Sequence, residues 1–190
     1  MAAKTNGHID KCMSSLFTRK GAFFSPCQRY RYSLTRLWGQ SPGPTSPDER
    51  LVMFIMLNPS TADEYRNDPT VERCERRARD WGYDGLIVCN LFAWRSTDPG
   101  VLKTLDDPVG PDNDWHIQQN AQDASLIVCA WGKDGELHGR GNQVADLLRH
   151  RNLTALKVSD KTGQPWHPLY LNYDLKPTPW KVLGNVSTET

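Results

Sequence analysis

A run of seven apolar residues, LVMFIML, covers positions 51–57 and ends at Asn58-Pro59. A short, unbroken apolar run bounded by turn-forming residues is typical of a strand that is buried on both faces. Open α/β sheets bind their ligands at the carboxyl ends of their parallel strands. We therefore predict that Asn58 lies at the ligand-binding edge of a sheet, and that other segments bring side chains to it.

The remaining apolar segments alternate with helical patterns. A helix is expected from Asp68-Pro69 to about Gly82, because aspartate is a good N-cap, proline suits the first helical position and glycine ends helices. An alternation of strands and helices indicates a parallel sheet with helices on its faces. The predicted fold class is α/β, a three-layer α/β/α architecture around a central, mainly parallel four-stranded sheet. The other expected strands cover 85–92, 126–132 and 153–158, with helical segments within 93–105, 108–124 and 139–151.

Ahead of this core, residues 28–38 (QRYRYSLTRLW) alternate between apolar and basic or polar positions, which predicts a half-buried strand. We expect it to form an N-terminal strand or hairpin extension, antiparallel to 51–57, with Arg29, Arg31 and Arg36 on an exposed face. The whole chain, 1–190, is expected to be one domain. Residues 1–26 are expected to be flexible or an extension, and 181–190 a tail.

The composition is that of a globular protein, with 24% charged and 38% hydrophobic residues. No apolar run reaches the roughly 20 residues of a membrane helix, and the first residues lack the apolar core of a signal peptide. We expect a cytoplasmic protein that does not contact membranes. The five cysteines include no C-x-x-C pair, so we expect reduced thiols and neither a metal nor another cofactor.

Net charge is +1, but its distribution is uneven. Residues 1–50 hold eight Lys/Arg against three Asp/Glu, residues 51–125 hold seven against thirteen, and residues 126–190 hold eight against six. The basic ends could face nucleic-acid phosphates or could simply be solvated. Charge alone favours neither interpretation.

Distinctive residues follow the predicted strands. They are Asn58-Pro59-Ser60, Asn90, Trp131-Gly132 and, after the last strand, His167-Pro168-Leu169-Tyr170. Parallel strands place their ends along one edge of the sheet, so these groups could converge in one cleft. The phosphate-binding glycine motifs and the G-x-S-x-G nucleophile elbow are absent from the sequence.

Most of the chain, roughly 29–180, resembles the bacterial and phage family DUF1643. The resemblance rests on IMLNPSTAD with NDPT, NLFAWRSTDP, AWG and the G-x-P-x-HPLYL ending. The same strand ends are similar to those of the uracil-DNA glycosylase superfamily, in its mismatch-specific or thymine-DNA glycosylase-like branch. That resemblance implies a monofunctional DNA glycosylase that flips a nucleotide out of the stack and hydrolyses its N-glycosidic bond. DNA, double- or single-stranded, would be its partner, and the protein is expected to be a monomer.

The resemblance also implies roles for individual residues. Asn58 would position the attacking water, Asn90 would read the base, and His167 would donate to the base oxygen on which negative charge develops, an effect of about 3 kcal/mol. Asp63 or Asp68 could act as a base, although a helix N-cap remains the simpler interpretation of Asp68. Leu169 and Tyr170 would fill the gap left by the flipped base, with core packing as the alternative for Leu169.

Further candidates are weighed against structural roles. Tyr65 or Trp94 could stack on the base, but aromatic residues more often serve in packing. Arg95 and Arg140 could contact phosphates or form surface salt bridges. No lysine occupies the motifs, which favours single-step hydrolysis over Schiff-base chemistry.

The residues after Asn58-Pro59 bear on the substrate. Enzymes strict for uracil carry a tyrosine there that blocks the pyrimidine C5 position, whereas this chain continues with the small residues Ser60-Thr61-Ala62. The hypothesis is excision of a C5-modified pyrimidine, such as the hydroxymethylated or glycosylated cytosines of phage DNA, for antiviral defence. The alternatives are a non-catalytic protein that binds modified DNA or nucleotides, a uracil or mismatch repair glycosylase, and an unrelated small-molecule hydrolase.

Overall fold

The computed structural model describes residues 20–38 and 50–181, and these form an α/β fold around one mixed sheet. Its strands are β1 (Lys20–Phe24), β2 (Arg31–Leu37), β3 (Leu51–Met56), β4 (Gly85–Asn90), β5 (Leu126–Cys129), β6 (Leu153–Ala155) and β7 (Thr178–Pro179). The α-helices in the described ranges are α2 (Pro69–Asp80), α3 (Asn113–Asp123) and α4 (Arg140–Leu147). Three short 3₁₀ helices, η1 (Pro99–Lys103), η2 (Lys133–Gly139) and η3 (Pro168–Tyr170), lie in the connections between them.

The strands are arranged in the order β1-β2-β4-β3-β5-β6-β7. β3 pairs in parallel with both β4 and β5, and β5 pairs in parallel with β6. The expected parallel core of four strands is therefore present, but three antiparallel strands extend it to seven, with β1 and β2 at one edge and β7 at the other. β3 is central, so its carboxyl end has a strand end on each side.

One expectation for the N-terminal region was wrong. β2 does not pair with 51–57; it lies antiparallel to β4, with Leu34 opposite Val88, and to β1. Residues 20–24, part of the segment expected to be flexible or an extension, form the edge strand β1, which pairs with β2 as an N-terminal extension of the sheet. The remaining residues of 1–26 that precede β1, and nearly all of the 181–190 tail, lie outside the described residues.

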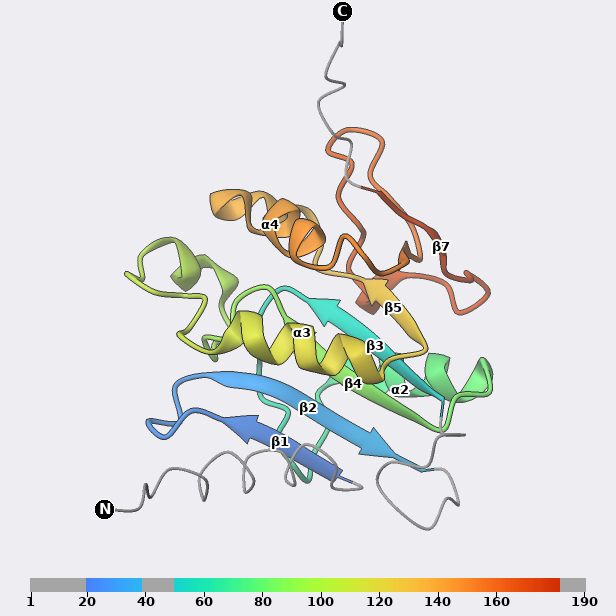
Figure 1. The fold of residues 1–190 in the computed structure, drawn as a ribbon, viewed down its shortest axis with the longest axis horizontal. Coiled ribbons are helices and arrows are strands. Elements are labelled where there is room, and N and C mark those ends of the chain that lie inside the picture. Colours follow the sequence, from blue (N-terminus) through green and yellow to red (C-terminus); the bar gives the residue numbers. More distant parts are fainter. Residues whose placement is uncertain (1–19, 39–49, 182–190) are drawn as a thin grey trace, which may run out of the picture.

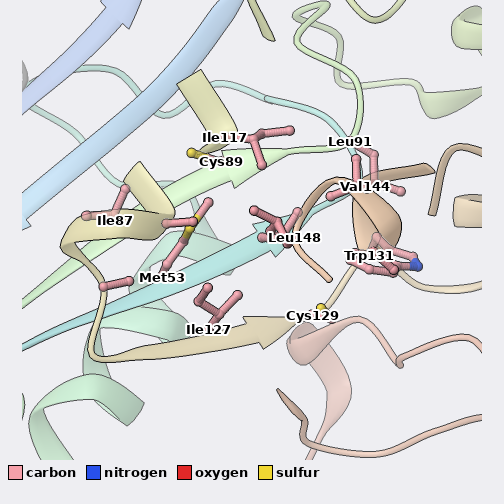
Figure 2. Close-up of a cluster of buried hydrophobic side chains, with 14 of the residues drawn as sticks. Met53, Ile87, Cys89, Leu91, Ile117, Ile127, Cys129, Trp131, Val144 and Leu148 are labelled. Carbon is pink, nitrogen blue, oxygen red and sulfur yellow. The ribbon is translucent and has the colours of Figure 1, made fainter. Parts of the chain in front are cut away.

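Helices cover both faces of the sheet (Figure 1). On one face, α3 and α4 pack against alternate residues of β3, β4 and β5, and Figure 2 shows this cluster, with Met53, Ile87 and Ile127 facing Ile117 and Leu148. On the other face, α2 packs against the intervening strand residues. Each central strand therefore buries both of its faces, which explains its unbroken apolar sequence.

The prediction of exposed arginines on β2 was wrong for Arg31 and Arg36, which are 1% and 3% exposed. Arg36 donates to the carbonyl oxygens of Thr35 and Asp63 and to Oδ1 of Asn67. The loop between β3 and α2 therefore covers the face of β2 that the alternation left for solvent. Arg29 alone of the three is exposed.

His116 on α3 is buried between aromatic rings of the first two strands. Its ring centroid lies 4.7 Å from that of Tyr32, with the planes 8° apart, and 4.5 Å from that of Phe23. Its Nδ1 atom is buried and has no hydrogen-bond partner in the part of the chain that the structure describes. Burial lowers the pKa of His116 from 6.5 to about 4, and nearby Asp112 opposes the shift.

We predict that titration of His116 lowers the free energy of unfolding as the pH falls. The unfolded chain takes up a proton below pH 6.5 and the folded chain only near pH 4, so the contribution is complete above 6.5 and is lost on the way down to 4. His116→Phe keeps the stacked ring but cannot titrate. Between pH 7 and 4.5 the wild type should lose about 2 kcal/mol more unfolding free energy than the variant, measured by urea denaturation. Equal losses would contradict the prediction.

Candidate functional site

A cavity of about 520 Å³ opens at the carboxyl ends of the central strands, on the α2 side of the sheet. Its wall is built from the ends of β3 and β5, the loop after β4, the start of α2, the segment around η3, and one side chain of β2. The residues are Arg31, Met56, Leu57, Asn58, Ser60, Asp68, Thr70, Ser96, Thr97, Pro99, Trp131, Gly132, Lys133, Asp134, His167, Leu169 and Tyr170. The expected convergence of Asn58, Ser60, His167 and the residues after it is therefore present.

Asn58 is fixed by the loop that follows β4. Its Nδ2 donates to the carbonyl oxygen of Ser96 at 2.8 Å and to that of Pro59 at 3.1 Å. The Ser96 N–H in turn donates to the Pro59 carbonyl at 2.9 Å. Because the amide nitrogen is engaged, the side-chain oxygen of this half-buried residue is the atom left to accept a hydrogen bond.

Asp68 is buried at the first turn of α2 and is the N-cap that the sequence predicts. Its Oδ1 accepts from the backbone N–H groups of Thr70 and Val71, both at 2.9 Å. Its Oδ2 accepts no hydrogen bond from the described residues. The carboxylate can therefore cap the helix with Oδ1, while Oδ2 can accept a hydrogen bond in the cavity.

His167 reaches the cavity by a longer route than the sequence indicates. β6 ends at Ala155, and a turn with a bridge between Val158 and Pro165 brings the chain back. Gly132 N–H donates to the Pro165 carbonyl at 2.9 Å, which fastens this segment to the end of β5. Gly132 has φ +78°, a conformation that favours glycine.

The His167 ring is held as a neutral hydrogen-bond donor. Its Nδ1 accepts from Leu169 N–H at 3.4 Å, so the proton of the neutral ring sits on Nε2. Burial lowers the pKa of His167, and the negative charge of Asp68 opposes this shift. Burial therefore favours the neutral imidazole.

Leu169 and Tyr170 follow on η3, at the rim. Leu169 is half-buried, whereas Tyr170 is 89% exposed. The segment is secured from behind by the buried Arg77 of α2, which donates to the carbonyl oxygens of Leu171 and Asn172 at 2.8 and 2.9 Å. A projecting aromatic side chain thus stands on a rigid support beside the cavity.

Comparison with known proteins gives one match. The sequence profile of a family described as a protein of unknown function, DUF1643, matches residues 31–169. The chain belongs to the DUF1643 family. The matched range holds every cavity residue except Tyr170. No curated protein and no solved structure matches the chain.

Several other candidates of the DUF1643 chain do not line the cavity. Asp63 is used locally, because its Oδ1 accepts from the N–H groups of Tyr65 and Arg66. Tyr65 is exposed and lines a separate surface groove with Arg36 and Asn67. Trp94 packs edge-on against Tyr30 at 5.4 Å. Stacking of Tyr65 or Trp94 on a base in this cavity has no support from these positions.

Asn90 ends β4 as expected, but it is not among the residues that line the cavity. It is completely buried, and its Cα pairs with that of Met56. Neither Oδ1 nor Nδ2 has a hydrogen-bond partner among residues 20–38 and 50–181. Buried amides without partners are rare in folded proteins. Asn90 therefore contributes unused hydrogen-bonding capacity on the strand beside Met56, a residue of the wall.

Arg95 and Arg140 lie outside the cavity wall of the DUF1643 fold. Arg140 is buried, donates to the Leu91 carbonyl at 3.0 Å and pairs with Asp114, so it is not available to phosphates. Arg95 donates to the Gln28 carbonyl and lies over the Phe24 ring. Both side chains therefore link loops to other segments of the fold.

Sequence reasoning missed some cavity residues. Arg31 was expected on an exposed face, and Ser96 and Thr97 were seen only as part of a motif. Lys133 and Asp134 follow Trp131-Gly132 directly, so their place after a strand was the available signal. For Arg31 the sequence offered no signal, because its burial depends on a loop distant in the chain.

Two features are absent from residues 20–38 and 50–181. No helix there is long and apolar enough to cross a membrane. No group of three or more His, Cys, Asp or Glu side chains is arranged to hold a metal ion.

We predict that capping and chemistry at Asp68 can be separated by mutation. Asp68→Ala removes both the negative charge near Arg31 and His167 and the acceptor for two backbone N–H groups. Asp68→Asn loses the same charge but keeps a capping oxygen, so the asparagine variant should have an unfolding free energy about 1 kcal/mol higher than the alanine variant. Denaturant titration of both variants measures the difference. Equal losses would contradict capping as the stabilising role.

Proposed function

We propose that this DUF1643 protein is a monofunctional DNA glycosylase that hydrolyses the N-glycosidic bond of a flipped, modified pyrimidine. The observation that carries the proposal is the meeting, in one cavity, of Asn58, Asp68 and His167 with Tyr170 at the rim. Each comes from a different part of the chain. Together they supply a water acceptor, a carboxylate, a neutral donor and a side chain that can replace an extruded base.

Asn58 and Asp68 suit the attacking side of the reaction. The free Oδ1 of Asn58 accepts one hydrogen of a water molecule, and Oδ2 of Asp68 accepts the other. The water oxygen bonds to C1′ of the sugar as the C1′–N1 bond breaks, and the electrons of that bond leave with the base. The proton taken by Asp68 then passes to the departing base. One water is consumed, and an abasic sugar and a free base are formed.

His167 suits the leaving-group side. Negative charge develops on the base oxygens as the bond breaks, and a fixed N–H donor stabilises it in a water-poor site. The ring presents Nε2–H because Nδ1 already accepts from Leu169. Because the neutral imidazole already carries the donor hydrogen, it does not have to gain a proton to act at neutral pH.

The wall beside Asn58 leaves room for a substituent on the base. Ser60 lines the cavity and is half-buried, and the residues after it are small. A tyrosine in this stretch would occupy the space beside the pyrimidine C5 position, and a serine does not. This supports C5-modified bases, such as the hydroxymethylated or glycosylated cytosines of phage DNA, as substrates in antiviral defence. Similarity of the four motifs to the uracil-DNA glycosylase superfamily supports the same reaction class.

The first prediction from this proposal concerns base release. The purified protein, incubated with phage DNA containing hypermodified cytosines, should liberate free bases detectable by mass spectrometry and leave abasic sites. Asn58→Ala and Asp68→Asn should each slow release by about 100-fold or more, because each removes a group that acts on the water. Both variants should still bind the DNA.

The controls distinguish the alternatives. A protein that only binds modified DNA releases no base, whereas a small-molecule hydrolase cleaves free nucleosides and ignores DNA. A uracil repair enzyme releases uracil from unmodified DNA that contains it. Undiminished release by Asn58→Ala would contradict the assigned role of that residue.

The second prediction concerns the rim. Tyr170→Ala should lower turnover on double-stranded DNA by about 10-fold or more and leave turnover on single strands nearly unchanged, because only a duplex has a gap to fill. Tyr65→Ala is the matched control, since Tyr65 is 77% exposed but lies outside the cavity. The same loss on both DNA forms would show that Tyr170 does not act as a wedge.

A further inference from the structure

Arg31 is a buried cation in the cavity wall whose hydrogen-bonding capacity is largely unused. The side chain is 1% exposed, and its Nη1 donates to the Ala62 carbonyl oxygen. Its Nε is buried without a partner, and Nη2 makes no hydrogen bond to the described residues. Nε and Nη2 form the side-on fork of the guanidinium group, which suits two adjacent acceptor atoms.

The charge of Arg31 persists at neutral pH. Burial lowers its pKa to about 10, and nearby Asp68 raises it, while Arg95 and Arg36 lower it. A guanidinium group has five N–H donors and no acceptor. Whatever meets it in the cavity must therefore present acceptors.

A second group without partners lies on the neighbouring strand. β2 and β4 are adjacent, and Asn90 at the end of β4 has both amide atoms buried and unpaired. Its Cα pairs with that of Met56, which lines the same cavity as Arg31. Two polar side chains without protein partners in one region indicate a ligand with polar atoms, because buried polar groups are normally paired.

We propose that Arg31 is the residue that selects the base, and that it favours cytosine-type over uracil-type pyrimidines. This rests on the proposed function. Cytosine presents two adjacent acceptors, O2 and N3, which match the donor fork. Uracil carries a hydrogen on N3, so on its O2–N3 edge the N3–H donor would face an N–H donor of Arg31. The contact uses the edge of the ring opposite C5, so it leaves a C5 substituent free.

The test uses two DNA probes whose bases differ at N3 and in the substituent on C4, and the Arg31 variants isolate the contribution of the O2–N3 edge. Oligonucleotides carry a 2′-fluoroarabino nucleotide, which resists cleavage, with 5-hydroxymethylcytosine or 5-hydroxymethyluracil as its base. The wild type should bind the cytosine probe roughly 5- to 100-fold more tightly, the range of one good bidentate contact. Arg31→Lys keeps the charge but loses the fork, and should reduce this ratio to near one. Arg31→Gln should do the same if the lysine variant does not fold.

Arg36→Lys is the matched control. Arg36 is a buried arginine of the same strand whose Nε, Nη1 and Nη2 all have protein partners. This variant should lose stability and keep the wild-type ratio.

The outcomes are distinguishable. A wild type that releases bases from DNA but binds both probes equally overturns the role of Arg31 and leaves the glycosylase proposal intact. An unchanged ratio in a folded Arg31→Lys variant does the same. A wild type that neither releases a base nor prefers modified DNA overturns both.

Discussion

Arg31 is a buried guanidinium group, and the negative charge of nearby Asp68 favours its charged form. Taking an arginine out of water is costly unless an opposite charge and hydrogen bonds replace its hydration. Asp68 opposes the effect of burial on the pKa values of both Arg31 and His167. It also caps α2 with two backbone hydrogen bonds. One carboxylate thus acts on the start of α2, on Arg31 and on His167. A substitution of Asp68 is therefore expected to affect all three.

The rest of the cavity is assembled largely by main-chain hydrogen bonds between loops. Ser96 N–H to Pro59 joins the loop after β4 to the end of β3, and Gly132 N–H to Pro165 joins the end of β5 to the segment before His167. Arg77 fixes the chain after Tyr170 from the side of α2. Such bonds depend little on side-chain identity. The geometry of the wall is therefore set by the backbone, which leaves its side chains to determine chemistry and selectivity.

Local signals in the sequence predicted local structure well. The helix 69–80 has the N-cap aspartate and the proline that predict a helix start. The central strands have the apolar runs that burial on both faces requires. Because strand ends follow from strand positions, Asn58, Ser60 and the groups after β5 were placed correctly. The part of the site that depends on these local features could be predicted.

Long-range pairing could not be predicted in the same way. The alternation in 28–38 indicates a half-exposed strand, yet β2 is covered on one face by α3 and on the other by the loop before α2. The sequence of the strand itself does not indicate that both of its faces are covered. The burial of Arg31 and Arg36, the pairing of β2 with β4 and the packing of Trp94 on Tyr30 all depend on segments far apart in sequence.

Arg31 and His167, two of the basic side chains in the cavity wall, differ in their charge at neutral pH. Burial acts on both, but a guanidinium group starts from a pKa so high that it remains charged, whereas an imidazole becomes neutral. Arg31 therefore supplies a permanent positive charge and His167 a neutral N–H donor at neutral pH. In the proposed glycosylase reaction, such a pair would stabilise a leaving group that gains negative charge without any proton being taken from solvent. Binding of an acceptor-rich base would then not depend on a histidine cation, which is lost as the pH rises.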